Sequence, residues 1–223
     1  MTKECIMDGM GWNYSDKVKE HFLRPHNVLD VNEEEYNADG IGYVGSPACG
    51  DMMKIFIKVQ DDKIVDLKWQ TFGCASAIGS TSMLSDIVVR DGGMSLEDAY
   101  KITPEMIIAE LGGLPSNKIH CSVLGDKALR EAINDYYRKS GHPEKIPHNK
   151  ESRIVCHCLN VTEEDIKMEV LEGVKDFDEL QKRTKVGTGC GKCVDEVKTL
   201  LAQFVEKYYK DQVYTGSSCG TNK

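Results

Sequence analysis

The chain has 223 residues, 40% of them hydrophobic, and 36 acidic residues against 28 basic ones give it a net charge of -8. Such a chain repels phosphate backbones, it has no apolar run near the ~18 residues that cross a bilayer, and its first residues lack the basic-then-apolar order of a signal peptide. We therefore expect a cytoplasmic protein, with no nucleic acid and no membrane among its partners, and with enough chain for one or two domains.

The first 140 residues predict helices packed on a small antiparallel sheet. A short helix over 14–27 is stopped by Pro25, and the acidic, then Gly-rich segment over 31–51 predicts a loop. Residues 52–59 and 64–72 alternate between apolar and polar around a QDDK turn, which predicts a hairpin with one wet face. The apolar face of this hairpin should hold Met53, Ile55, Ile57 and Val59 from the first strand and Val65, Leu67 and Trp69 from the second.

Three helices should complete this first domain, which we assign to residues 1–140. Small residues over 74–89 would let a helix lie close to the sheet, and Thr103 followed by Pro104 marks the start of a second helix. Residues 121–139 have apolar side chains at four-residue spacing, which is typical of an amphipathic helix.

A polar stretch with two prolines at 141–152 predicts a linker to a second, small all-α domain over 153–208. The tail over 209–223 should be flexible. The fold class is therefore α+β. The second domain should contain one helix capped by Thr162 and Asp165 that ends on Gly173, another over 176–184 and a last one over 191–209.

Four cysteines form two close pairs in the second domain, in "VCHCLN" and "GCGKC". In a reducing compartment, clustered thiols are more often metal ligands than disulfides. Both pairs lie at predicted helix starts, whose partial positive charge would stabilise a dianionic cluster. A [2Fe–2S] cluster therefore fits better than a structural zinc, which stays an alternative. His157 is more simply an exposed loop residue than a ligand.

The spacing C-x-C-x31-C-x2-C between short helices resembles the bacterioferritin-associated-ferredoxin-like [2Fe–2S] domain over roughly residues 153–208. The resemblance implies that a permanent [2Fe–2S] cluster is bound by Cys156, Cys158, Cys190 and Cys193.

Three further cysteines stand apart in the first domain. Cys49 lies in a Pro/Gly turn, whereas Cys74 and Cys121 open predicted helices. Each alone would usually be a small buried core residue. Together they differ from that pattern, because all three lie at element ends and two lie at helix N-termini, where the thiol pKa falls. Asp51 follows Cys49 by two residues, and His120 precedes Cys121.

The motifs "GSPACGD", "GCASAIGSTS" and "LPSNKIHCSVLG" closely resemble the IscU/NifU family of iron–sulfur cluster scaffolds, from about Tyr14 to Ser140. With the second domain, the chain is similar to the NifU type. Two features depart from the family: a third domain with its own C-x-x-C is missing, and "LPSNK" at 114–118 replaces a Leu-Pro-Pro-Val-Lys chaperone motif.

The resemblance implies a transient [2Fe–2S] or [4Fe–4S] cluster built from iron at a site of the first domain, where zinc is the other metal to consider. Its partners would be a cysteine desulfurase of the NifS/IscS type and apo iron–sulfur proteins as acceptors. The ligands carried over from the family are Cys49, Asp51, Cys74, His120 and Cys121.

We therefore predict a scaffold and not an enzyme, with three alternative functions left open. The chain could be an electron-transfer module, a protein with two structural zinc sites, or a thiol enzyme in which His120 activates Cys121. The sequence leaves the oligomeric state open, and a homodimer with a cluster between its subunits is compatible with the scaffold function. Cys5 and Cys219 have no partner at a recognisable spacing, so we interpret both as incidental.

Overall fold

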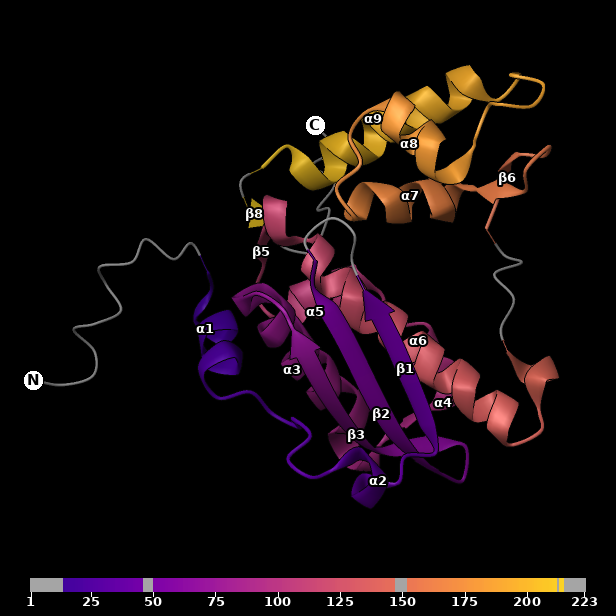
Figure 1. The fold of residues 1–223 in the computed structure, drawn as a ribbon. Coiled ribbons are helices and arrows are strands. Elements are labelled where there is room, and N and C mark those ends of the chain that lie inside the picture. The colour runs from indigo at the N-terminus through magenta and orange to yellow at the C-terminus, as the bar shows by residue number, and fades with distance from the viewer. Residues whose placement is uncertain (1–13, 46–49, 147–151, 212, 215–223) are drawn as a thin grey trace, which may run out of the picture.

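The computed structural model describes residues 14–45, 50–146, 152–211 and 213–214. A four-stranded antiparallel sheet in the order β1-β2-β3-β4 forms the first part of the chain, and a helical part follows it (Figure 1). The strands of this sheet are β1 (Gly40–Gly45), β2 (Met52–Gln60), β3 (Lys63–Phe72) and β4 (Met94–Ser95). The helices of the first part are α1 (Asp16–Leu23), α2 (Glu33–Tyr36), α3 (Ala75–Val89), α4 (Leu96–Tyr100), α5 (Pro104–Glu110) and α6 (His120–Lys139), with short 3-10 turns between some of them.

The core of the first part lies between the sheet and two long helices, α3 and α6. Met53, Ile55 and Ile57 of β2 are fully buried there, as the alternation predicted. Ala128 and Ala132 of α6 are also fully buried. Mixed helix and antiparallel sheet confirm the α+β class.

Strand β1 corrects the prediction that residues 31–51 form a loop. Glycines suggested irregular backbone, yet Gly40 to Gly45 pair antiparallel with β2 along the whole strand. The glycines are needed because α6 crosses β1 closely. A Cβ atom on Gly42 would overlap the carbonyl oxygen of Ala128, and one on Gly40 would overlap that of Ala132. Close approach of two backbones, and not a turn, explains this composition.

The Gly42→Ala substitution should therefore destabilise the first part strongly. The added methyl group meets backbone that cannot move aside, so we expect a loss of about 3 kcal/mol in the free energy of unfolding. Gly45→Ala is the matched control, because its Cβ would lie 3.9 Å from the nearest atom, the Asp51 carbonyl oxygen. Urea unfolding followed by circular dichroism compares the two. Equal stability of both variants would contradict the close packing of α6 on β1.

The second face of the hairpin is less wet than the alternation predicted. Phe56 points away from the main core but is fully buried, in a small cluster with Leu29 and Tyr36. Tyr36 belongs to α2, a one-turn helix inside the segment predicted to be a loop. The hydroxyl of Tyr36 donates to Asp66 on β3 at 3.0 Å, which ties this turn to the sheet.

A β-bulge explains why one residue of β3 faces the opposite way from its prediction. Lys58 pairs with Asp66 and Val59 pairs with Ile64, so Val65 has no partner. The extra residue shifts the alternation by one position. Ile64 is therefore buried, while Val65, predicted to face the core, is 41% exposed.

The second part consists mainly of α7 (Glu163–Leu171), α8 (Phe177–Thr184) and α9 (Val194–Tyr209). Thr162 and Asp165 form the capping box that the sequence predicted. The part is not purely helical, because β6 (Ile154–Cys156) and β7 (Val161–Thr162) pair antiparallel. This short ladder encloses the "CHCLN" segment, so it fixes the chain on both sides of the first thiol pair.

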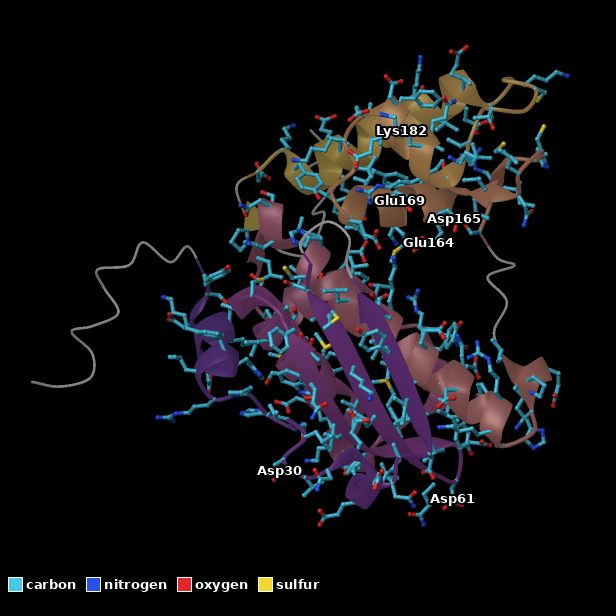
Figure 2. The ribbon with its side chains drawn as sticks, viewed as in Figure 1. Asp30, Asp61, Glu164, Asp165, Glu169 and Lys182 are labelled. Carbon is cyan, nitrogen blue, oxygen red and sulfur yellow. The ribbon has the colours of Figure 1, made fainter. Side chains whose placement is uncertain are left out.

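Polar contacts join the two parts. Glu105 of α5 accepts a hydrogen bond from the Tyr208 hydroxyl at 2.7 Å and forms an ion pair with Lys167 at 3.5 Å. Lys127 of α6 forms an ion pair with Glu172. Figure 2 shows Glu164 of α7 on the side that faces the first part. Burial opposes the ionisation of Glu105, but Tyr208 and Lys167 outweigh it and hold the pKa of this carboxyl below its usual value.

The chain after α9 returns to the first part. Strand β8 (Val213–Tyr214) pairs antiparallel with β5 (Leu114–Pro115), and the Ser116 hydroxyl donates to the carbonyl oxygen of Asp211. This pairing differs from the expectation of a flexible tail from residue 209. No helix in the described ranges is long and apolar enough to cross a membrane.

Candidate functional site

Three of the residues predicted to form the transient site come together in the first part. One ligand atom each from Asp51, Cys74 and Cys121 lies within 4.8 Å of the other two. The sulfur atoms of Cys74 and Cys121 are 3.3 Å apart, and the backbone N–H of Cys74 points to the Asp51 carboxylate at 3.5 Å. Cys49 lies outside the described residues.

Local structure explains how distant segments meet at this point. The antiparallel pairing of Met52 with Phe72 brings the start of β2 beside the end of β3. Asp51 precedes the first of these strands, and Cys74 follows the second as the N-cap of α3. Gly73 sits between them, where a Cβ atom would come within 3.2 Å of the Asp51 carboxylate. Cys121 enters from the first turn of α6.

The hydrogen bond between the two thiols of this site favours the thiolate form of Cys74. A hydrogen bond from Cys121 lowers the pKa of Cys74 to about 5, with help from the N–H groups of Ala77 and Ser76, against the opposing effects of burial and of Asp51. The two amides belong to the first turn of α3, where backbone N–H groups are free. The site therefore presents a thiolate, the form that binds metal and attacks sulfur.

Alkylation of metal-free protein should reveal this thiolate. In the presence of a chelator, the rate of Cys74 modification by iodoacetamide should reach half of its limiting value near pH 5, because only the thiolate reacts and the pKa of Cys74 is about 5. An ordinary thiol reaches half of its limiting rate only at pH ~8.5. The Cys121→Ala variant should move the midpoint upward, since it removes the largest cause of the shift. Mass spectrometry of the peptide with Cys74 gives the rate. A midpoint near 8.5 in the unmodified chain would contradict this description.

His120 lies beside the site but outside the group of three ligand atoms. Its Nε2 is buried and has no hydrogen-bond partner among the described residues. Burial lowers the pKa of His120, and the charges of Cys74 and Asp51 partly offset that effect. A neutral imidazole with a free nitrogen is the form that ligates metals.

The four thiols of the second part form two crosswise pairs. The Cys158 sulfur lies 3.4 Å from that of Cys190, and the Cys193 thiol donates to Cys156. Cys156 and Cys193 are buried, whereas Cys158 and Cys190 are exposed. His157 is exposed and sits between the first two cysteines.

Backbone amides around these thiols favour their thiolate forms. A hydrogen bond from the N–H of Gly187 is the largest cause that lowers the pKa of Cys156, and the N–H of Lys192 does the same for Cys190. Gly189 is packed so closely that a Cβ atom would lie 3.0 Å from Cβ of Cys158. Gly187, Gly189 and Lys192 were not predicted as site residues, although the glycine run "VGTGCGKC" indicates a backbone that approaches its surroundings closely.

The four sulfur atoms lie as two pairs and not around a single point. A single tetrahedral zinc would hold all four within about 3.8 Å of one another. Among the described residues, no group of ligand atoms within 4.8 Å of one another contains three of these sulfurs. Four thiols at one end of this part would hold a [2Fe–2S] cluster, which takes thiolate ligands.

Comparisons with known proteins agree with both halves of this description. Residues 13–143 match the family described as "NifU-like N terminal domain", and residues 154–203 match the "BFD-like [2Fe-2S] binding domain". The iron-sulfur cluster assembly scaffold protein IscU 1 of Archaeoglobus fulgidus is 50% identical over 133 residues, which are 60% of this chain and 82% of that protein. The nitrogen fixation protein NifU of a Nostoc species is 39% identical over 202 residues, covering 87% of this chain and 65% of that protein.

Proposed function

Because this chain belongs to the family of the NifU-like N terminal domain, we propose that it is a scaffold on which iron–sulfur clusters are assembled before their transfer to apo iron–sulfur proteins. The observation that carries the proposal is the meeting of Asp51, Cys74 and Cys121, from three separate segments, at one partly buried point. The ligands of the cargo cluster are these three residues with Cys49, and His120 is the candidate for an exchangeable position.

The Cys74 thiolate, with the Cys121 thiol beside it, is suited to accept sulfur. We propose a cysteine desulfurase as the donor. The scaffold thiolate attacks the outer sulfur of a persulfide on that enzyme, forms a new S–S bond and releases the enzyme's cysteine as a thiolate. Two electrons, delivered by a redox partner, reduce the outer sulfur of this persulfide to sulfide and restore the scaffold thiolate. Ferrous iron binds to that sulfide, to the thiolates and to the carboxylate. Asp51 is a harder ligand than a thiolate, so it holds an iron of the cluster less firmly and favours release.

The second part of the chain is proposed to bind a resident [2Fe–2S] cluster through Cys156, Cys158, Cys190 and Cys193. When bound, such a cluster supplies one-electron redox chemistry. The exposed edge at Cys158 and Cys190 suits electron exchange with a partner, and sulfur that arrives as a persulfide must be reduced to sulfide. This exposed edge is also the observation that favours the alternative function, an electron-transfer module. A reducing compartment such as the cytoplasm suits so many free thiols.

Cluster transfer tests the proposal. The full chain is incubated without oxygen with a cysteine desulfurase, cysteine and ferrous iron, then purified again and mixed with an apo-ferredoxin. We expect new absorbance on the scaffold and its later appearance as holo-ferredoxin, measured by circular dichroism in the visible range. If no cluster builds up beyond the resident one, the scaffold function fails and the electron-transfer alternative gains support.

A further inference from the structure

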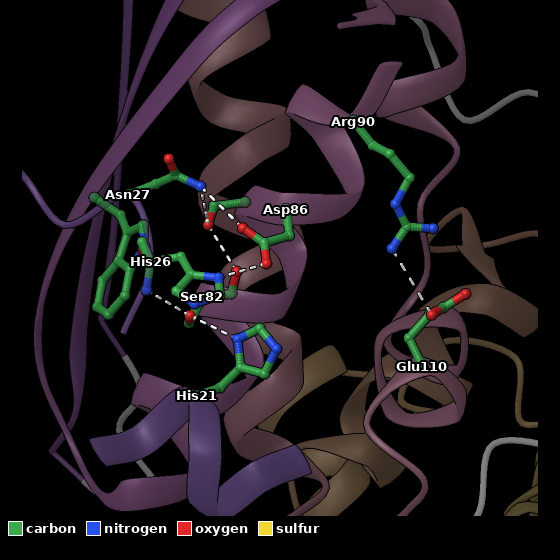
Figure 3. A network of polar contacts seen from close by, with 9 residues as sticks. His21, His26, Asn27, Ser82, Asp86, Arg90 and Glu110 are labelled. Atoms are coloured by element: carbon green, nitrogen blue, oxygen red, sulfur yellow. Dashed lines mark hydrogen bonds and ion pairs between the residues drawn. The ribbon is translucent and has the colours of Figure 1, made fainter. Parts of the chain in front are cut away.

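A second group of metal-ligating side chains lies away from the cysteines. His21 of α1, His26 in the turn after that helix and Asp86 of α3 each offer one ligand atom, and these atoms lie within 4.8 Å of one another. Figure 3 shows the side chain of His21 against Ser82 and that of His26 against Asp86. The scaffold function uses none of them.

The two imidazoles are held by specific hydrogen bonds. His21 is buried, and its Nδ1 contacts the Ser82 hydroxyl oxygen at 2.8 Å. The same oxygen accepts the backbone N–H of His26 at 2.9 Å. The ring of His26 contacts the Asp86 carboxylate through Nδ1 at 2.6 Å, and the centroids of the two rings are 4.9 Å apart.

A further layer of contacts orients these ligands. The side-chain amide of Asn27 donates to the other carboxylate oxygen of Asp86 and to the Ser85 hydroxyl, both at 3.1 Å. The indole N–H of Trp69 donates to the carbonyl oxygen of His26 at 2.8 Å. Metal-binding carboxylates and imidazoles are commonly fixed by partners of this kind. Burial lowers the pKa of His21, which keeps its ring in the neutral form that ligates.

This group is separate from the cysteine site. Cys74 caps the start of α3, and Asp86 lies near the end of the same helix. With 1.5 Å of rise per residue, the two positions are about 18 Å apart along the helix axis. No single ion or small cluster reaches both.

We propose that His21, His26 and Asp86 bind a divalent first-row transition-metal ion. Two imidazoles and one carboxylate form the donor set that suits ferrous iron and zinc, and both metals keep open positions in such sites. The side chains of His26 and Asp86 are 46% and 30% exposed, so the ion can enter from solvent and retain water ligands. The Ser82 hydroxyl lies between the two histidines as a further oxygen donor.

The bound ion would also fasten two segments together. His21 and His26 belong to the N-terminal helix and its turn, whereas Asp86 belongs to a core helix. An ion that binds only the folded chain stabilises it by mass action. We therefore expect cobalt(II) to raise the melting temperature of the full chain through these residues.

Cobalt(II) binding by the full chain tests the proposal. In equilibrium dialysis under anaerobic conditions, the wild-type chain should bind about one cobalt ion more than the His26→Gln or the Asp86→Asn chain. If the variants still bind this ion, their affinity for cobalt should be at least ~10-fold weaker. The difference between the absorption spectra of the cobalt-loaded wild type and variant should lack the intense thiolate-to-cobalt band that the cysteine sites produce. His142→Gln is the matched control, because His142 also contacts a carboxylate, Glu144, but belongs to no group of three ligand atoms among the described residues.

Two results would overturn the proposal. One is equal cobalt binding by the wild type, His26→Gln and Asp86→Asn. The other is a loss of cobalt confined to the thiolate band. Circular dichroism of each variant first confirms that it is folded. If His26→Gln does not fold, Asp86→Asn serves as the test, because asparagine has the same shape as aspartate. With either overturning result, the group only fixes the turn after α1 by hydrogen bonds.

Discussion

The Cys121→Ala substitution is expected to abolish assembly of the transient cluster and to leave the resident cluster unchanged. The variant loses one of the described ligands and also the donor that keeps Cys74 ionised. Neither sulfur transfer nor iron binding can then proceed at the normal rate, and we expect a fall of roughly 100-fold or more in cluster build-up, about 2.7 kcal/mol in activation free energy. The measurement is the absorbance gained with a desulfurase, cysteine and ferrous iron.

Cys156→Ala is the reciprocal variant. It removes a thiolate of the second part, so the colour of the purified protein should be lost while the first part keeps its three described ligands. If Cys121→Ala still builds and transfers a cluster normally, the scaffold site is wrongly assigned. If Cys156→Ala remains coloured after purification, the resident cluster is not where we propose it.

The Asp51→Ala substitution should slow the transfer of the cluster by roughly tenfold. Removal of the carboxylate takes away the hard ligand and the group whose charge opposes ionisation of Cys74. The cluster should consequently be held by thiolates alone, survive purification better and pass to an apo-ferredoxin more slowly. Transfer kinetics of the two proteins, measured side by side without oxygen, give the comparison.

Asp61→Ala provides the control for charge alone. Asp61, which is labelled in Figure 2, lies in the turn of the β2–β3 hairpin, and Asp51 precedes the opposite end of the same hairpin. The Asp61→Ala variant should transfer its cluster at the same rate as the unmodified chain. Equal or faster transfer by Asp51→Ala would mean that lability has another origin, and His120 would then be the residue to replace next.

The sequence predicted the elements that depend on local patterns. The Thr162 capping box, the Pro104 helix start and the buried face of β2 follow from side chains within a few residues of one another. The elements it missed depend on distant contacts. The glycines of β1 make sense only when α6 lies against them, and the outward turn of Val65 comes from a bulge set by strand pairing.

The candidate sites show the same division. Helix starts marked Cys74 and Cys121 as reactive, but only the β2–β3 hairpin brings Asp51 to them. The amides of Gly187 and Lys192 act through the backbone, so residue type gives little sign of their role. The sequence did not predict the group of His21, His26 and Asp86, because three strands separate α1 from α3 in the chain and the two helices become neighbours only in the fold.

A count of iron, zinc and acid-labile sulfide tests the account most directly. Protein purified without air should contain about two irons and two sulfides per chain, as in one [2Fe–2S] cluster. After incubation with a desulfurase, cysteine and ferrous iron, both counts should rise, and an apo-ferredoxin should remove only the added part. Colourless protein with stoichiometric zinc, no sulfide and no transferable iron would contradict both the resident cluster and the scaffold.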